Sequence, residues 1–169
     1  MQVENYTDAV GQKFHADGSV RTYPGNTIIC FVDSQRHSAI YQRCLWVQAQ
    51  LQAMPWQHKL TFLPPSSFHM TTMELLCDQV RTPAYWSSRL PLSASLEETD
   101  AFFLSNVPTV PEPGHLRMRF KFIRKPTIIE LEPADKETEA AIWRYRNQIA
   151  EVTGVRFPGH KQYKFHIAL

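Results

Sequence analysis

Two segments far apart in the chain contain the same pair of residues, Phe-His, inside a short apolar run typical of a β-strand. The first segment is residues 67–75, with His69, and the second is residues 163–169, with His166. In each half of the chain a strand-like and a helix-like segment precede the Phe-His pair, a pattern consistent with internal duplication. If the two strands lie side by side, related by a pseudo-twofold axis, both imidazoles face one groove.

Hydrophobic patterns predict the elements of the first half. Residues 26–32 form a continuous apolar strand, and residues 38–54 carry an apolar stripe at helical spacing. The first Phe-His strand follows at residues 67–75. Ser95 and Glu98 then form an S-x-x-E capping box, which predicts a short helix after it.

The second half is expected to contain three more strands and one helix. Residues 116–123 predict a strand with one buried face, residues 127–132 its partner, and residues 163–169 the second Phe-His strand. A helix is predicted over residues 133–152, with the proline in its first turn and Gly154 just past its end. The expected buried face of the first of these strands comprises Leu116, Met118, Phe120 and Phe122.

The chain of 169 residues is long enough for one domain, or for two small lobes that share a core. Three prolines between residues 108 and 113 form a stiff connector between the halves. We therefore expect a single domain over residues 1–169, with one lobe at about 24–107 and a second at about 114–169.

Composition limits the classes of function. A net charge of +2 fits an anionic small ligand and is too weak for a nucleic-acid coat. Cys30, Cys44 and Cys77 include no CxxC pair, so we expect buried thiols in a reducing compartment. The first eight residues lack a signal-peptide pattern, and the longest apolar run, residues 28–32, is too short to cross a bilayer. We expect a cytoplasmic protein without a membrane partner.

The first Phe-His strand carries side chains that suit phosphate chemistry. Residues two apart in a strand share a face, so His69 lies on the face of Ser67 and Thr71. Of two facing histidines, a neutral one can take a proton and a protonated one can give one. The Thr71 hydroxyl would donate to a phosphoryl oxygen, where charge builds in the transition state. The other five histidines lack such partners and are expected in exposed loops: His15, His37, His58, His115 and His160.

The second Phe-His strand has Ala168 at the position that corresponds to Thr71, so a second hydroxyl donor is missing. Losing one donor costs on the order of 2–4 kcal/mol of transition-state stabilisation. Lys164, on the predicted face of His166, would compensate as a point charge on the phosphate. Asn26, at the start of the first strand, is a further candidate ligand contact. The sequence has no HExxH, CxxC or dense carboxylate cluster, and we expect no metal and no other cofactor.

At these residues the chain resembles a known superfamily. His69-Met70-Thr71 and His166-Ile167-Ala168 look like the twin H-x-[TS] motifs of the 2H phosphoesterases, the LigT-like cyclic phosphodiesterase group, with a departure at Ala168. The wider pattern is similar to one branch of that superfamily, DUF1868. The matching stretches are residues 13–20, 23–27, 62–71, 131–135 and 163–166.

The resemblance implies a bilobal α+β fold with two antiparallel sheets around a central groove and helices on the outer faces. It also implies catalytic histidines, hydroxyls that grip phosphate, and no metal. Members act on 2′,3′-cyclic phosphates, 2′-5′-linked oligonucleotides or ADP-ribose cyclic phosphate. The resemblance thus predicts a hydrolase that opens a cyclic phosphodiester with His69 and His166, and partners that are small phosphorylated or nucleotide-like ligands, RNA ends among them. Which histidine is the acid stays open.

The end of the chain introduces alternatives. In the superfamily the chain continues past the second motif, so we expect the last strand to lie at an edge that a second chain could cover. Together with Ala168, this short C-terminus is expected to weaken catalysis. One alternative is a ligand-binding module that has lost turnover. Another is a small-molecule isomerase or cyclase that uses both histidines on a metabolite without phosphate.

Overall fold

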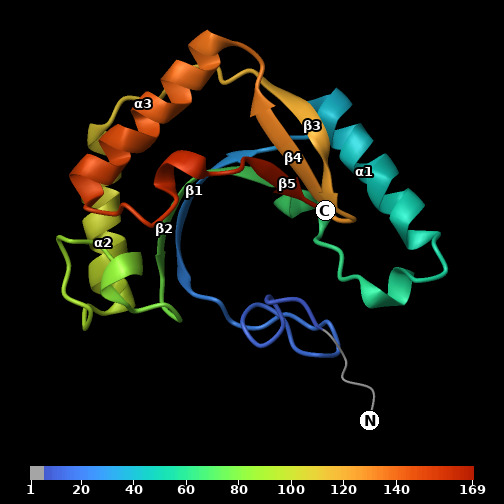
Figure 1. Cartoon of the computed structure of the whole chain (residues 1–169), viewed down its shortest axis with the longest axis horizontal. Coiled ribbons are helices and arrows are strands. Elements are labelled where there is room, and N and C mark those ends of the chain that lie inside the picture. Colours follow the sequence, from blue (N-terminus) through green and yellow to red (C-terminus); the bar gives the residue numbers. More distant parts are fainter. Residues whose placement is uncertain (1–5) are drawn as a thin grey trace.

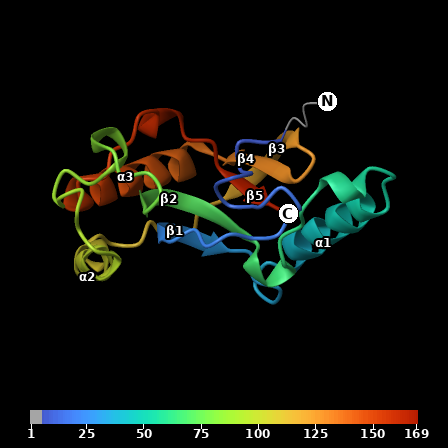
Figure 2. The same ribbon diagram turned by 90° about the horizontal axis from the view of Figure 1, so that it is seen from below.

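One five-stranded antiparallel sheet organises the chain in the computed structural model, which describes residues 6–169. The strand order is β1-β2-β5-β4-β3, so the last strand along the chain lies in the middle of the sheet. Figure 1 and Figure 2 show α2 and α3 at one end of the molecule and α1 at the other. The strands are β1 Gly25–Phe31, β2 His69–Cys77, β3 Met118–Lys125, β4 Ile128–Pro133 and β5 His166–Ala168; the helices are α1 Ser38–Gln52, α2 Leu96–Asn106 and α3 Lys136–Thr153.

The α+β class is confirmed, but the described residues form one sheet where two were expected. The strand pairs β1–β2 and β3–β4 would each form a separate antiparallel ribbon without β5. Ile167 of β5 pairs with Met70 of β2 on one side and with Ile129 of β4 on the other. This short strand therefore joins the two ribbons into a continuous sheet. It is an interior strand, so the open edge expected beside His166 is not present in the described chain.

Local sequence rules set the helix ends. The Ser95 hydroxyl accepts a hydrogen bond from the Glu98 backbone N–H at 3.1 Å, and the Glu98 carboxylate accepts from the Ser95 N–H at 2.7 Å, so the predicted capping box is confirmed. Helix α3 ends at Gly154, whose φ of 69° lies in the left-handed region that favours glycine. The predicted place of Pro133 in the first turn is wrong. Pro133 ends β4, and Asp135 caps the helix.

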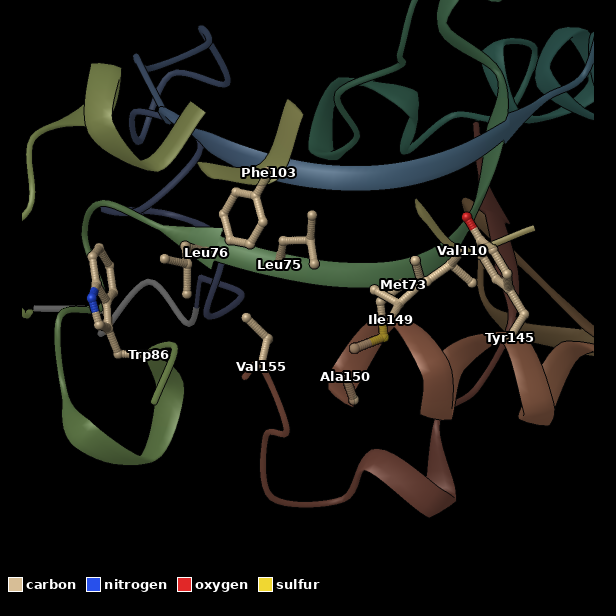
Figure 3. Close-up of a cluster of buried hydrophobic side chains, with 10 residues drawn as sticks. All are labelled: Met73, Leu75, Leu76, Trp86, Phe103, Val110, Tyr145, Ile149, Ala150 and Val155. Atoms are coloured by element: carbon tan, nitrogen blue, oxygen red, sulfur yellow. The ribbon is translucent and has the colours of Figure 1, made fainter. Parts of the chain in front are cut away.

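Two clusters of buried side chains hold the sheet to the helices. Figure 3 shows the first, in which Leu75 of β2 packs near Phe103 of α2 and Ile149 of α3. The second cluster lies around the short strand β5 and includes Met70 and Ile167. Because α3 contributes to both clusters, it covers the sheet on both sides of the junction between the ribbons.

Two expectations about burial are wrong. In β3, Phe120 and Phe122 remain 62% and 43% exposed, because β3 is an edge strand and its register with β4 shifts between these two residues. Cys44 is buried, but Cys30 is exposed on the other edge strand, β1.

Within residues 6–169, no helix combines the length and the apolar character needed to cross a bilayer.

Candidate active site

The two Phe-His segments meet at the junction between β2 and β5 (Figure 1). Met70 and Ile167 are register partners there, and both side chains are buried in the core. Because side chains alternate along a strand, the flanking residues His69, Thr71 and His166 lie on the opposite face of the sheet. All three are half-buried.

The antiparallel register fixes the neighbours of each histidine. Since Met70 faces Ile167, Thr71 lies across from His166, and Ala168 lies across from His69. His69 and His166 are therefore diagonal neighbours, a relationship in which two residues are roughly 7–8 Å apart and their Cβ atoms somewhat closer. The structure thus places both histidines and the Thr71 hydroxyl on one small area of the sheet.

Both imidazoles are oriented by the same kind of contact. Nδ1 of His69 lies 2.6 Å from the carbonyl oxygen of Ser67, and Nδ1 of His166 lies 2.9 Å from the carbonyl oxygen of Lys164. A carbonyl oxygen can only accept, so each Nδ1 carries the proton of this hydrogen bond. In the neutral ring, Nε2 then holds the free lone pair, which is the form a general base needs.

Tyr163 is a candidate site residue that the sequence patterns did not identify; it lines a pocket that adjoins His166. Burial raises the pKa of its phenol above the ordinary value, and the carboxylate of Glu74 raises it further. The positive charge of Arg146 and a hydrogen bond with Thr71 act in the opposite direction. The phenol therefore keeps its proton at neutral pH and lies next to the Thr71 hydroxyl. Its position three residues before His166 was the available signal.

Glu130 is a second residue that the sequence did not reveal. It lies across from His166 in the β4–β5 pair, and only 2% of its surface is exposed. Two cations compensate the buried carboxylate: Lys121 Nζ lies 3.3 Å from Oε1, and Arg124 Nε lies 3.4 Å from Oε2. Buried carboxylates need such partners because loss of hydration is costly. His166 therefore has a charged cluster on one side and a hydroxyl on the other.

A pocket of about 330 Å³ adjoins His166. Its lining includes three cations, Arg124, Arg146 and Lys164, but only one carboxylate, Glu74. Small-molecule sites occupy about 300–1,000 Å³, so this pocket is at the lower end of that range. The excess of positive charge favours an anionic ligand. Among the predicted site residues, Lys164 and His166 line this pocket, whereas His69 and Thr71 do not.

Two other predicted contacts have partners within the protein. The Ser67 hydroxyl donates to the carbonyl of Pro64 at 2.7 Å, in a 3₁₀ turn that precedes β2. The amide of Asn26 donates to the carboxylate of Asp100 in α2 at 2.6 Å. The structure does not bring either side chain to the pocket beside His166, and their roles as ligand contacts stay predictions.

His160 was expected in an exposed loop, and this is wrong. The side chain is only 7% exposed, and its Nε2 lies 3.2 Å from Oδ1 of Asn147. Burial, followed by the positive charge of Arg146, lowers the pKa of His160 to about 4. This third imidazole of the region lines the same pocket as His166 and is neutral at physiological pH.

No three side chains of His, Cys, Asp or Glu gather into a metal-binding group within the part of the chain that the structure describes. Glu130 already lies beside two cations, and Glu74 of the pocket lining interacts electrostatically with Arg146.

Comparisons with known proteins agree with the resemblance seen in the sequence. A family model described as "2H-phosphodiest: Domain of unknown function (DUF1868)" matches residues 13–129, which include His69 and Thr71. A comparison with curated proteins finds no match. The chain is similar to the crystal structure of a conserved protein of unknown function from Agrobacterium tumefaciens, with a TM-score of 0.90 and 26% sequence identity. The match covers 98% of this chain and 70% of the Agrobacterium chain.

Proposed function

We propose that this chain, which belongs to the 2H-phosphodiest family (DUF1868), is a phosphoesterase that opens cyclic phosphodiesters with His69 and His166 as an acid–base pair. The observation that carries the proposal is the register of β2 against β5, with Met70 facing Ile167. This register supports the proposal because it puts both imidazoles on one face of the sheet, beside the Thr71 hydroxyl. Each imidazole is held there through Nδ1. Nucleotides and RNA ends that carry a 2′,3′-cyclic phosphate fit this chemistry.

In this reaction a water molecule attacks phosphorus, and one ester P–O bond of the ring breaks. The neutral histidine takes a proton from the water through Nε2, while the protonated histidine gives one to the leaving oxygen. The product is a phosphate monoester with a free hydroxyl, and the pair ends with its protons exchanged. Thr71 and the phenol of Tyr163 donate to the phosphoryl oxygens, whose charge increases in the transition state. Lys164 lines the pocket beside His166 and adds a positive charge there.

The test is turnover of 2′,3′-cyclic nucleotides by the wild-type chain and by the variants His69→Ala and His166→Ala. Each of these two substitutions should lower kcat by about 10²–10⁴-fold, the usual contribution of a general acid or base. His58→Ala is the matched control, because His58 is exposed in a 3₁₀ turn outside the sheet. Wild-type rates in both active-site variants would contradict the proposal.

One observation favours the ligand-binding alternative. Ala168 lies across from His69 and has no hydroxyl, so the second motif lacks the hydrogen-bond donor that Thr71 would offer a phosphate in the first. A module of this kind would bind a 2′,3′-cyclic nucleotide in isothermal titration and leave it intact during long incubation. Detectable product that disappears in His69→Ala excludes this alternative.

A further inference from the structure

Arg146 of α3 is a buried cation that interacts electrostatically with Glu74 but forms no direct ion pair in the described chain. It is only 2% exposed, and it donates to the backbone carbonyls of Thr72 and His160. Its Nε is buried and has no hydrogen-bond partner, and no carboxylate within residues 6–169 lies at ion-pair distance from the guanidinium. The group lies 4.3 Å from the centroid of the Tyr163 ring. A buried charge without a direct ion pair is costly, so such a group is expected to serve a ligand.

The surroundings of Arg146 reinforce its positive charge. Arg146 lines the pocket beside His166, and so does Lys164, which forms no ion pair in the described chain. Burial and three neighbouring cations together lower the pKa of His160 to about 4. These cations are Arg146, Arg156 and Lys161. The potential at this end of the pocket is therefore positive.

We propose that this pocket binds a second anionic group of the substrate, so that the substrate is a cyclic phosphate ester bearing a further phosphate. The inference rests on the proposed function, because His166 belongs to both the catalytic pair and the pocket lining. The second phosphate would supply the direct ion pair that Arg146 lacks. Glu74, the carboxylate of the lining, disfavours a ligand that is negative throughout. An uncharged part of the substrate, such as a sugar, lies beside Glu74.

The first experiment measures binding without turnover. Inorganic phosphate is titrated into the full chain while the ring signals of His160 and His69 are followed by NMR. Binding in the pocket should raise the pKa of His160 and should weaken at least about threefold in Lys164→Gln, because one cation is lost. Lys161→Gln is the matched control: it removes a cation near His160 that does not line the pocket, so phosphate affinity should persist. A response of His69 with none from His160 overturns the second site.

The second experiment compares two substrates, a 2′,3′-cyclic nucleotide with a 5′-phosphate and the same compound without it. The 5′-phosphate should raise kcat/KM about tenfold or more, as expected for one charge-assisted contact. The ratio should fall toward one in Lys164→Gln and stay unchanged in Lys161→Gln. Equal kcat/KM for the two compounds refutes the second anion site and leaves the proposed function standing. If neither is turned over while phosphate still shifts His160, the proposed function fails and the anion site stands.

Discussion

The buried imidazole of His160 should make folding stability depend on pH in a defined window. The pKa of this ring is about 4 in the folded chain, against an ordinary value of about 6.5. The unfolded chain therefore binds a proton near pH 6.5, whereas the folded chain binds one only near pH 4. The stabilising contribution of neutral His160 is fully present above pH 6.5 and is lost as the pH falls from about 6.5 to about 4. A shift of this size corresponds to about 3 kcal/mol, which solvent screening near the pocket reduces to roughly 1–2 kcal/mol.

The assay is urea unfolding of the wild-type chain and of His160→Gln at pH 7.5 and at pH 4.5. Glutamine does not titrate, so the variant should lose about 1–2 kcal/mol less stability than the wild type over this range. Other groups titrate equally in both proteins and cancel in the difference. His58→Gln, at an exposed position, should follow the wild type. The reasoning is refuted if His160→Gln and the wild type lose the same free energy of unfolding.

Four further substitutions test the site and its frame. Ala168→Ser restores a hydroxyl across from His69 and should raise kcat for 2′,3′-cyclic nucleotides severalfold; an unchanged kcat would show that the missing donor does not limit the rate. Tyr163→Phe should lower kcat on the order of tenfold or more with an unchanged circular dichroism spectrum, and wild-type activity would exclude the phenol as a donor. Ile167→Ala should cost about 2–5 kcal/mol in urea unfolding, and a smaller loss would mean that the side chain is less buried than its 3% exposure indicates. Ser95→Ala should cost about 1 kcal/mol in the same assay by removing the cap of α2, and an unchanged midpoint would contradict that role.

The features predicted correctly from the sequence are those that local rules determine. Ser95 and Glu98 form a cap wherever a helix begins after them, and Gly154 adopts a backbone conformation that few other residues tolerate. The family was also predictable, because several ordered motifs lie along the chain and the family model covers residues 13–129. The single sheet was not predictable from these rules. It depends on the pairing of Ile167 with Ile129 and with Met70, which lie about 40 and 100 residues earlier in the chain.

Burial was the property that sequence patterns predicted least well. The alternation around Phe120 and Phe122 correctly indicates a strand, but it does not reveal whether another element covers the apolar face. Conversely, Glu130 and Arg146 look like ordinary charged residues of a strand and a helix, and both are buried. Their burial depends on contacts between distant segments, such as Arg146 with the carbonyl of Thr72. Glu130 and Arg146 lie near the candidate site, and sequence patterns missed them because their burial depends on these distant contacts.

The two Phe-His motifs hold their imidazoles through the same backbone contact, but the residues around the two rings differ. This difference bears on the direction in which a phosphodiester would bind. Both imidazoles are held through Nδ1 by the carbonyl two residues earlier. Beyond this contact they differ, because His69 faces Ala168 whereas His166 lies between Thr71 and Glu130 and also borders the pocket. A symmetrical pair would accept a phosphodiester in either direction. The hydroxyl donor, the charged cluster and the pocket all lie on the side of His166. Under the proposed function we therefore expect the two binding directions of a phosphodiester to differ in energy and the two histidines to take different parts in proton transfer.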